Sequence, residues 1–327
     1  MTTRSWLVAA LFGTFGALMT AWQPVEAENY PSRAVKLVVP YPPGGPIDMI
    51  GRLLAQNLSK MLDGQFFVEN VPGAGGTIGM RAVASAPADG HTILVANENL
   101  VLQAIVKANV PYDPLKSFAP VGLVASAPMM VAVHSSLPVR DMKELIALLK
   151  ASPGKYNYAS PGYGSSPHLA SEWLFNLTYG LNVVHVPFLG AAPAVQAVLS
   201  GEPPIFHEVL PAIAPHVQQG TLRALAIASA KRSAFFPAVP TLAETGTPGH
   251  EVAFWSGILL PAGSPNGIVG LLHRALTKTM ASPDVAGRLT TLGFEPIEST
   301  PEGFAAHIAA EADRWRKVVR EANIKIE

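Results

Sequence analysis

The sequence predicts an α/β fold built on a largely parallel sheet. Short apolar runs of strand length alternate with segments whose apolar residues recur at helical spacing. Corners rich in Gly, Pro and small residues join each strand-like run to the next helical segment. The first hundred residues follow a strand-helix-strand-helix-strand order, which is typical of a parallel sheet with helices packed on its faces.

The first three strands are expected at 35–41, 65–71 and 91–97. Apolar residues at helical spacing follow the first strand from Ile47 onward, and a helix is therefore expected between the first two strands. The glycine-rich stretch PGAGGTIG, residues 72–79, leads into a second helix before the third strand. This order predicts a βαβαβ unit.

The middle of the chain repeats the pattern after a strand-like segment at 121–133. Asp141 with Glu144 three residues later is a variant of the capping box and predicts a helix start. Further strands are expected at 156–160, 182–188, 203–209, 222–228 and 252–261, and further helices near 167–179, after 189–193 and near 211–219. Three more helices are expected to begin near Ser264, Ser282 and Thr300.

Two segments, near 121–133 and near 250–260, are expected to cross between two α/β lobes. The expected first lobe comprises residues 28–127 and 252–327, and the second comprises residues 128–251. A chain of this length has enough residues for two domains of ordinary size.

The N-terminus predicts export. Arg4 precedes an apolar run from Trp6 to Trp22, and Pro24 and a small-residue pattern ending at Ala27 follow. Residues 1–27 are therefore interpreted as a signal peptide, with cleavage after Ala27 and a periplasmic mature chain. The alternative is a membrane anchor, but the run is short for a span and two glycines interrupt it.

Composition excludes several classes of function. The 327 residues carry a formal net charge of +0, only 14% are charged, and no Lys/Arg-rich run indicates nucleic-acid binding. There is no cysteine, which removes disulfides, thiolate catalysis and cysteine metal sites. The nine histidines show no metal-ligand spacing. Neither a cofactor nor a metal is expected.

Three strand-to-helix corners share one pattern: small residues and then a proline at an expected first helical position. They are PPGGP (42–46), GYGSSP (162–167) and LGAAP (189–193). The N–H groups at a helix start have no intrahelical partner, and they carry the positive end of the helix dipole. Such corners are suited to holding an anion through the backbone, or they are ordinary tight turns. Asp48 is expected to bond back to the first corner and fix its shape.

The enzymatic alternatives rest on weaker patterns. The stretch GAGGTIG, with Gly73, Gly75 and Gly79, is a loosened form of a dinucleotide fingerprint whose spacing is broken. Ser165 and Ser166 near His168 are compatible with a hydrolase, although a serine before a proline is more often a helix cap. His185 lies in an apolar strand and is interpreted as a core residue.

The combination of motifs along the chain resembles the Bug family, the periplasmic substrate-binding receptors of tripartite tricarboxylate transporters. The resemblance covers about residues 30–323, and it rests on VVPYPPGGPID, VENVPGAGGTIG, ADGHTILVAN, YDPLKSFAPVGLVA, GKYNYASPGYGSSPHLASE, VHVPFLGAAPAVQAVLSG, LRALAIASAKRS, VPTLAETG and RWRKVV. It implies a type II periplasmic-binding-protein fold, in which two α/β lobes close on a ligand, and a non-enzymatic receptor that captures a small carboxylate.

The resemblance also implies the site residues. The expected first-lobe loop is Pro43, Gly44, Gly45, Pro46, Ile47 and Asp48, with Tyr41 before it and Asn97 at the end of the third strand. The expected second-lobe residues are Gly162, Gly164, Ser165, Ser166, His168, Phe188, Gly190, Ala191, Ala192, Pro193 and Glu208. The expected partners are a carboxylate ligand and the membrane components of a transporter, and the chain is expected to be a monomer.

Three positions depart from the family pattern. Ile47 replaces a small or hydroxylated residue, Phe188-Leu189-Gly190 replaces Tyr-Lys-Gly, and Glu208 stands where Asp is common. The loss of the Tyr and Lys groups argues against a strongly polar second anchor, and it predicts a ligand with one firmly held carboxylate and a partly apolar body, such as an aromatic acid or a longer diacid. An exported serine hydrolase and a ligand-sensing partner of a signalling protein remain the alternatives.

Overall fold

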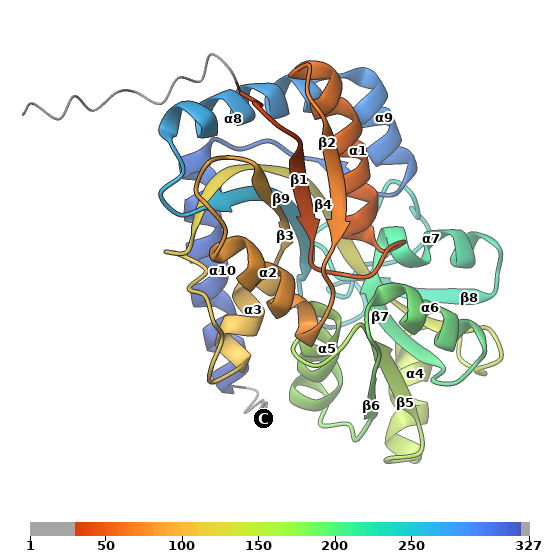
Figure 1. The fold of residues 1–327 in the computed structure, drawn as a ribbon. Coiled ribbons are helices and arrows are strands. Elements are labelled where there is room, and N and C mark those ends of the chain that lie inside the picture. The colour runs from red at the N-terminus through yellow and green to blue at the C-terminus, as the bar shows by residue number, and fades with distance from the viewer. Residues whose placement is uncertain (1–29, 322–327) are drawn as a thin grey trace, which may run out of the picture.

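The computed structural model describes residues 30–321, so the expected signal peptide lies outside the described residues. Within that range the strands form one curled sheet of ten strands (Figure 1). The strands are β1 (Val35–Val39), β2 (Phe66–Asn70), β3 (Thr92–Asn97), β4 (Phe118–His134), β5 (Asn157–Ser160), β6 (Val184–Pro187), β7 (Ile205–Val209), β8 (Leu222–Ile227), β9 (Ala253–Pro261) and β10 (Glu295–Pro296).

Helices cover both faces of this sheet. They are α1 (Pro46–Met61), α2 (Thr77–Ala84), α3 (Asn99–Val106), α4 (Met142–Ala151), α5 (Ser166–Ser171), α6 (Ala191–Leu199), α7 (Leu210–Gln218), α8 (Asn266–Met280), α9 (Pro283–Thr291) and α10 (Pro301–Glu321). A 3₁₀ turn, η2 (Ala74–Gly76), precedes α2, and a π-helical segment, η3 (Glu172–Thr178), continues α5. The sequence predicted the strands and helices of both halves, but it missed α3 and the short strand β10.

The strand order is β2-β1-β3-β9-β4-β7-β5-β6, with β8 and β10 also paired to β4. Pairing is parallel among β1, β2 and β3 and among β5, β6 and β7, as predicted. The centre differs, because β4 and β9 pair antiparallel with each other and with their neighbours. The chain passes from the first lobe to the second along β4 and returns along β9, so the two strands run in opposite directions where they pair.

The long strand β4 joins two α/β lobes, which gives the expected two-lobed fold (Figure 1). We call the part containing β1, β2, β3 and α10 the first lobe and the part containing β5 to β8 the second lobe. The partner of β4 changes from β9 at Pro128 to β7 at Met129. The predicted boundary between residues 127 and 128 falls at this change of partner, and the exact boundaries stay a prediction.

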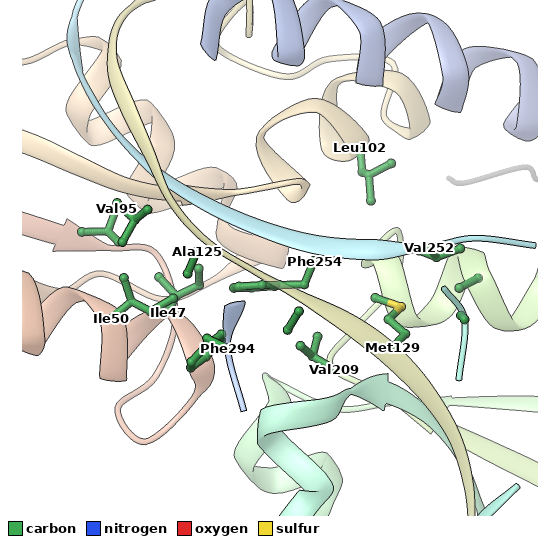
Figure 2. Packing of buried hydrophobic residues seen from close by; sticks show 14 of the residues in the cluster. Ile47, Ile50, Val95, Leu102, Ala125, Met129, Val209, Val252, Phe254 and Phe294 are labelled. Atoms are coloured by element: carbon green, nitrogen blue, oxygen red, sulfur yellow. The ribbon is translucent and has the colours of Figure 1, made fainter. Parts of the chain in front are cut away.

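The hydrophobic core runs through both lobes. Figure 2 shows Ile50, Ala125, Phe254, Met129 and Val209 as parts of one buried cluster around β4 and β9. A second cluster lies between the first-lobe sheet and helices α2, α3 and α10. A third lies between the second-lobe sheet and helices α6 and α7. The main cluster is continuous across the crossing strands β4 and β9, so the region that joins the two lobes is part of the hydrophobic core.

Local sequence explains where several helices begin. Asp141 accepts a hydrogen bond from the Glu144 N–H (2.8 Å), as in the predicted capping box. The return bond differs by one residue, because the Glu144 carboxylate accepts from the Arg140 N–H (2.7 Å) and not from the Asp141 N–H. Pro46 is the first residue of α1, as predicted. The other two corners differ, because Pro167 is the second residue of α5 and Pro193 the third residue of α6.

None of the helices within residues 30–321 combines the length and the apolar character that a bilayer crossing requires.

Candidate ligand-binding cleft

Two adjoining cavities lie between the lobes, at the carboxyl ends of β1, β3, β5 and β7. The inner cavity, of about 50 Å³, is lined from the first lobe by residues 41–42, 45–47 and 97–99, from the second by residues 161, 165–167, 191–192 and 208–209, and by Phe254. The outer cavity, of about 560 Å³, is lined by residues 72–76 and Lys107 on one side and by residues 161–163 and 187–190 on the other. Ligands of open α/β sheets bind at such strand ends.

The inner cavity is small. A buried water needs roughly 10–15 Å³ on the same measure, the space open to the centres of water-sized spheres. The inner cavity therefore accommodates a few waters or one small acid, and nothing as large as a dinucleotide. It shares Tyr41, Pro42, Asn99, Pro161 and Ser165 with the outer cavity, so the two cavities adjoin along these residues.

Asp48 fixes the first-lobe loop through hydrogen bonds and does not line either cavity. Its Oδ2 accepts hydrogen bonds from the Gly44 N–H (3.0 Å) and from Arg52 Nε (2.9 Å). Its Oδ1 accepts from Arg52 Nη2 (3.0 Å) and from Asn70 Nδ2 (2.9 Å), and Asn70 Nδ2 also donates to the Tyr41 carbonyl (3.0 Å). Although burial acts to raise it, the hydrogen bonds from Arg52 hold the pKa of Asp48 below its usual value. The predicted bond from Asp48 back to its own loop is confirmed.

A neutral network holds the second-lobe loop. Ser165 caps α5 by accepting from the His168 N–H (3.4 Å), and its hydroxyl donates to the Gly162 carbonyl (2.7 Å). The Gly164 N–H donates to His168 Nδ1 (3.1 Å), so that nitrogen must be unprotonated. Ser160 Oγ bonds to His185 Nε2 (2.6 Å), and the two histidine rings stack with centroids 4.0 Å apart. This network fixes the loop without any charged group.

Burial keeps these stacked histidines neutral. Desolvation lowers the pKa of His168 to about 4 and that of His185 to about 3, and in His185 the neighbouring His168 adds to the effect. The prediction that His185 is a satisfied core residue is borne out only in part, because the side chain is half-buried and its Nε2 is hydrogen bonded, while its Nδ1 has no partner within residues 30–321.

Two helix starts present free N–H groups at the inner cavity. In α1 the first intrahelical bond is from the Met49 N–H to the Gly45 carbonyl (3.1 Å), so the Ile47 N–H precedes the helical ladder. In α6 the first such bond is from the Ala194 N–H to the Gly190 carbonyl (3.4 Å), and Ala191 and Ala192 precede it. Since Ile47, Ala191 and Ala192 line the cavity, both positive helix ends face the same space.

The lobes are closed on each other in this structure. The Ser166 N–H donates to Asn99 Oδ1 (3.2 Å), and Gln103 Nε2 donates to the Tyr163 carbonyl (3.3 Å). The Ser166 hydroxyl also donates to Glu98 Oε1. These contacts join α3 and the residue before it, in the first lobe, to the second-lobe loop, and they define the closed state.

Gly190 allows a further close approach between the lobes. It has a φ of +117°, which favours glycine, and a Cβ placed on it would lie 3.2 Å from Pro42 Cδ. Gly75, at the outer cavity, allows a close approach within the first lobe, with a φ of +70° and the Gln103 side chain 2.8 Å from the position of a Cβ. The other glycines of the GAGGTIG stretch also allow close packing, since a Cβ on Gly73 would lie 2.6 Å from Ile78 Cδ1 and one on Gly79 would lie 2.7 Å from the Val71 carbonyl.

Two buried acids line the inner cavity. Glu98 is 2% exposed and Glu208 is 1% exposed, and burial raises the pKa of Glu98 to about 7 and that of Glu208 to about 8. Glu98 also accepts from the Trp255 N–H through Oε2 (3.3 Å). Among the described residues that line this cavity, none is Lys, Arg or His. Any anion held here is held by dipoles and hydrogen bonds, without a basic side chain.

A hydrogen-bonded triad joins three further lining residues. Tyr41 donates to Asn97 Oδ1 (2.8 Å), and Asn99 Nδ2 donates to the Tyr41 hydroxyl (2.9 Å). The triad ties the end of β3 and the start of α3 to the first-lobe loop. It therefore orients the Asn99 amide whose oxygen contacts the second lobe.

The comparisons with known proteins agree with this geometry. The profile of the family described as "Tripartite tricarboxylate transporter family receptor" matches residues 50–324. Protein BugT of Bordetella pertussis is 37% identical over 319 residues, which cover 97% of this chain and 98% of BugT. The chain belongs to this receptor family. The resemblance to the Bug family seen in the sequence is thus confirmed.

Solved structures of similar receptors share the fold. The structure "R. palustris Rpa4515 with adipate" has a TM-score of 0.87 and 34% identity, covering 90% of this chain and 99% of that one. MatC (Rpa3494) from Rhodopseudomonas palustris with bound malate has a TM-score of 0.85 and 32% identity, covering 89% and 100%. The type II periplasmic-binding-protein fold is therefore the fold of this receptor.

The receptor places the expected site residues in three groups. Those lining the inner cavity are Tyr41, Gly45, Pro46, Ile47, Asn97, Ser165, Ser166, Ala191, Ala192 and Glu208. Those lining only the outer cavity are Gly162, Phe188 and Gly190. Those lining neither cavity are Pro43, Gly44, Asp48, Gly164, His168 and Pro193. Within this third group Gly44, Asp48, Gly164 and His168 make the hydrogen bonds that shape the loops.

Sequence reasoning missed several lining residues of the receptor. Glu98 and Asn99 immediately follow Asn97, and this run of polar residues after a buried strand was a usable signal. Phe254 carried no such signal, because it lies within the apolar strand β9. Lys107, at the outer cavity, donates to the Ala74 carbonyl (2.6 Å) and so holds the glycine-rich turn.

Neither serine of the hydrolase alternative is paired with a histidine side chain. Ser165 Oγ donates to a carbonyl and Ser166 Oγ to Glu98, while His168 Nδ1 accepts from a backbone N–H. No group of three or more His, Asp or Glu residues with metal-binding geometry occurs in the part of the chain that the structure describes.

Proposed function

We propose that this receptor captures a small carboxylate between its lobes and delivers it to the membrane components of a tripartite transporter. The observation that carries the proposal is the convergence of the α1 and α6 starts on one inner cavity. The free N–H groups there favour an anion through hydrogen bonds and through the helix dipoles. The adipate and malate bound by the two similar receptors support this ligand class.

The lining also supports a ligand with a partly apolar body. Ile47, Val209 and Phe254 face the inner cavity together with several prolines. An aromatic acid or a longer diacid would bury its apolar part against these side chains, at roughly 25 cal/mol for each Å² removed from water. Ligand binding would then favour the closed state that Glu98, Asn99 and Ser166 hold together.

Binding without catalysis is the activity we infer. Of the two serines that a hydrolase would use, Ser165 donates its hydroxyl to the Gly162 carbonyl, and Ser166 donates its hydroxyl to Glu98 and joins the lobes. The proposal includes export with cleavage after Ala27, a monomeric mature chain, and lobes comprising residues 28–127 with 252–327 and residues 128–251.

Thermal unfolding of the refolded, ligand-free mature chain tests the proposal against mono-, di- and tricarboxylates, aromatic acids and their uncharged amides. A ligand at 100 times its Kd should add about 2.7 kcal/mol. For a chain of this size each kcal/mol should raise the Tm by about 2 °C or slightly more. A rise of several degrees with one class of acid is the expected result. No rise with any carboxylate would contradict the proposal.

A matched pair of variants locates the effect in the cleft. Ala192→Trp fills the inner cavity beside the start of α6 and should abolish the rise in Tm. Gln196→Trp places the same side chain at an exposed position one turn further along α6 and should leave the rise unchanged. Equal loss in both variants would mean that the ligand binds elsewhere.

A further inference from the structure

Glu208 has a buried carboxyl oxygen without a partner. The residue lines the inner cavity and is 1% exposed. Its Oε1 accepts a hydrogen bond from the Val209 N–H (2.8 Å), but its Oε2 has no hydrogen-bond partner in the described part of the chain. The other acid of the lining, Glu98, uses both of its oxygens, for the Ser166 hydroxyl and the Trp255 N–H. A buried polar atom without a partner is costly, so we expect a bound ligand to supply one for Glu208 Oε2.

The surroundings of Glu208 favour the neutral form of its carboxyl group. Burial is the main cause, because a carboxylate loses its hydration there, and the neighbouring Glu98 acts in the same direction. The hydrogen bond from the Val209 N–H opposes both, and the pKa of Glu208 is raised to about 8. Among the described residues of the lining, none is a basic side chain that would hold the carboxylate in its charged form. At neutral pH Glu208 is therefore mostly a protonated acid.

The groups that face Glu208 add no fixed charge. Its partner on β4 is Met130, and α6 contributes only alanines to the lining. Tyr41 from the first lobe is uncharged, because burial raises its pKa. His207 precedes Glu208 on β7, with its side chain on the opposite face of the strand, and burial lowers its pKa to about 3. Within the described lining, Glu98, with a pKa of about 7, is the one other group that titrates near neutral pH.

The proton of this neutral acid belongs on Oε2. Oε1 already accepts from the Val209 N–H, which leaves the O–H of the acid at the oxygen without a partner. An ionised carboxylate accepts hydrogen bonds and donates none. A ligand carboxylate therefore matches a protonated Glu208, and an ionised Glu208 disfavours it.

The small size of the inner cavity brings a bound carboxylate to Glu208. The cavity, of about 50 Å³, holds only a few waters, and the starts of three helices, α1, α6 and α7, meet at it. The start of α7 is taken up by the protein's own acid, since Glu208 accepts from the Val209 N–H. The starts of α1 and α6 keep free N–H groups. We expect a carboxylate held by those N–H groups to fill most of this space and to contact Glu208.

We propose that Glu208 binds the ligand as a neutral acid and donates its Oε2 proton in a hydrogen bond to the ligand carboxylate. This inference rests on the proposed carboxylate-binding function and deepens it, because capture of the acid then requires one bound proton. Where Glu208 is ionised in the free receptor, binding of the ligand anion takes up one proton from the solvent. The affinity for carboxylates therefore decreases as Glu208 ionises.

Titration calorimetry on the refolded mature chain tests this with succinate, adipate, benzoate and terephthalate, which all stay fully ionised from about pH 7 to 9. Repeating each titration in buffers of different ionisation enthalpy gives the number of protons taken up. At about pH 8 the wild-type chain should take up about half a proton for each acid bound, because about half of the free Glu208 is ionised there. Its affinity should fall about tenfold between about pH 7 and 9.

Glu208→Gln removes the proton but keeps the hydrogen-bond pattern. The amide oxygen accepts from the Val209 N–H, and the amide nitrogen donates to the ligand at every pH. This variant should bind the acid at about pH 7 within about twofold of wild type, and its affinity should stay constant up to about pH 9. Glu251→Gln removes one charge at an exposed position near the start of β9 and should keep the wild-type pH dependence and proton uptake.

Glu98 remains in each of these variants, so any proton uptake that it causes is the same in all of them and cancels in the comparison. Circular dichroism and the Tm at each pH show that every variant is folded. If Glu208→Gln does not fold, Glu208→Ala takes its place. The alanine variant has no proton to donate, so it should bind the acid more weakly than wild type at about pH 7 and show no pH dependence.

The outcomes separate this inference from the proposed function. An affinity that does not change between about pH 7 and 9 overturns the role of Glu208 and leaves the carboxylate receptor intact. Equal proton uptake in wild type and in the Glu208 variant also overturns it. Proton release on binding overturns it as well, because Glu208 would then act as an ionised acceptor. The absence of binding by all four acids overturns the proposed function itself.

Discussion

The two loops that face each other across the inner cavity are both held in a fixed shape, but by different kinds of side chain. The first-lobe loop is fixed by an ionised Asp48 bonded to Gly44, Arg52 and Asn70. The second-lobe loop is fixed by neutral groups, with His168 accepting from Gly164. Both arrangements hold backbone groups in place for a ligand. They differ in their response to protons, because a carboxylate of low pKa stays charged where a histidine begins to titrate.

The largest expected effect is a loss of stability in acid, which depends on six buried or half-buried ionisable groups. Burial lowers the pKa of four histidines to about 3 or about 4 and raises that of two glutamates to about 7 and about 8. These groups are His168, His185, His207, His250, Glu98 and Glu208.

The signs of the two contributions are opposite. Below pH 6.5 the unfolded chain binds protons at the four histidines and the folded chain does not, so stability falls as the pH decreases. The glutamates contribute stability at low pH that is lost as the pH rises through about 7 and about 8. We expect the free energy of unfolding to be greatest between about pH 6.5 and 7 and to fall by about 3 kcal/mol at pH 5.

Urea unfolding between pH 5 and 8.5 measures this profile, and two variants sharpen the comparison of the loops. His168→Gln should reduce the loss between pH 6.5 and 5 by about 1.5 kcal/mol, because one of the four proton sites is gone. Asp48→Asn should lower stability by a similar amount at both pH values, since Asp48 is already ionised throughout the range. A stability that increases steadily from pH 6.5 to 5 would contradict the assignment of neutral histidines.

A smaller effect is expected from breaking the first loop at neutral pH. Asp48→Ala leaves the Gly44 N–H, the Arg52 guanidinium and one Asn70 contact without their acceptor, and it should cost about 2 kcal/mol. The partial exposure of Arg52 limits the cost. Affinity for carboxylates should fall as well, since the loop then loses its fixed shape.

Asp313→Ala is the control for that substitution, because it removes an exposed ion pair with Arg316 (2.9 Å). Pairs of this kind contribute about 0–1 kcal/mol. Denaturant midpoints of the two variants should differ clearly. Equal midpoints would mean that the first loop does not depend on its charged network.

The smallest effect is expected at the contact between the loops. Ser166→Ala removes the hydroxyl that bonds to Glu98 across the cleft and should weaken ligand binding by about fivefold to tenfold, because the closed state loses one buried hydrogen bond. Ser200→Ala, at an exposed hydroxyl that bonds within the end of α6, should leave affinity unchanged. Titration calorimetry with one bound acid provides both values. An unchanged affinity in Ser166→Ala would show that this contact does not control closure.

Local sequence determined most of the fold and part of the cleft. The alternation of apolar runs, the capping residues and Pro46 at the start of α1 each act over a few residues, so their patterns can be read directly from the chain. The same holds for Asp48, whose main partners Gly44 and Arg52 lie within one helical turn of it. The three small-residue corners were also correctly placed at the cleft, although two of their prolines lie deeper in the helix than predicted.

The tertiary structure alone decided which side chains meet across the cleft. Ser166 and Glu98 are 68 residues apart, and the contact exists because β4 carries the chain from one lobe to the other and the lobes close. The spacing of apolar residues predicts individual helices and strands, and it contains no information about a contact between two residues this far apart in the chain. The free oxygen of Glu208 is decided in the same way: the sequence places an acid at the end of β7, but only the packing of three helix starts around one cavity leaves Oε2 buried without a partner.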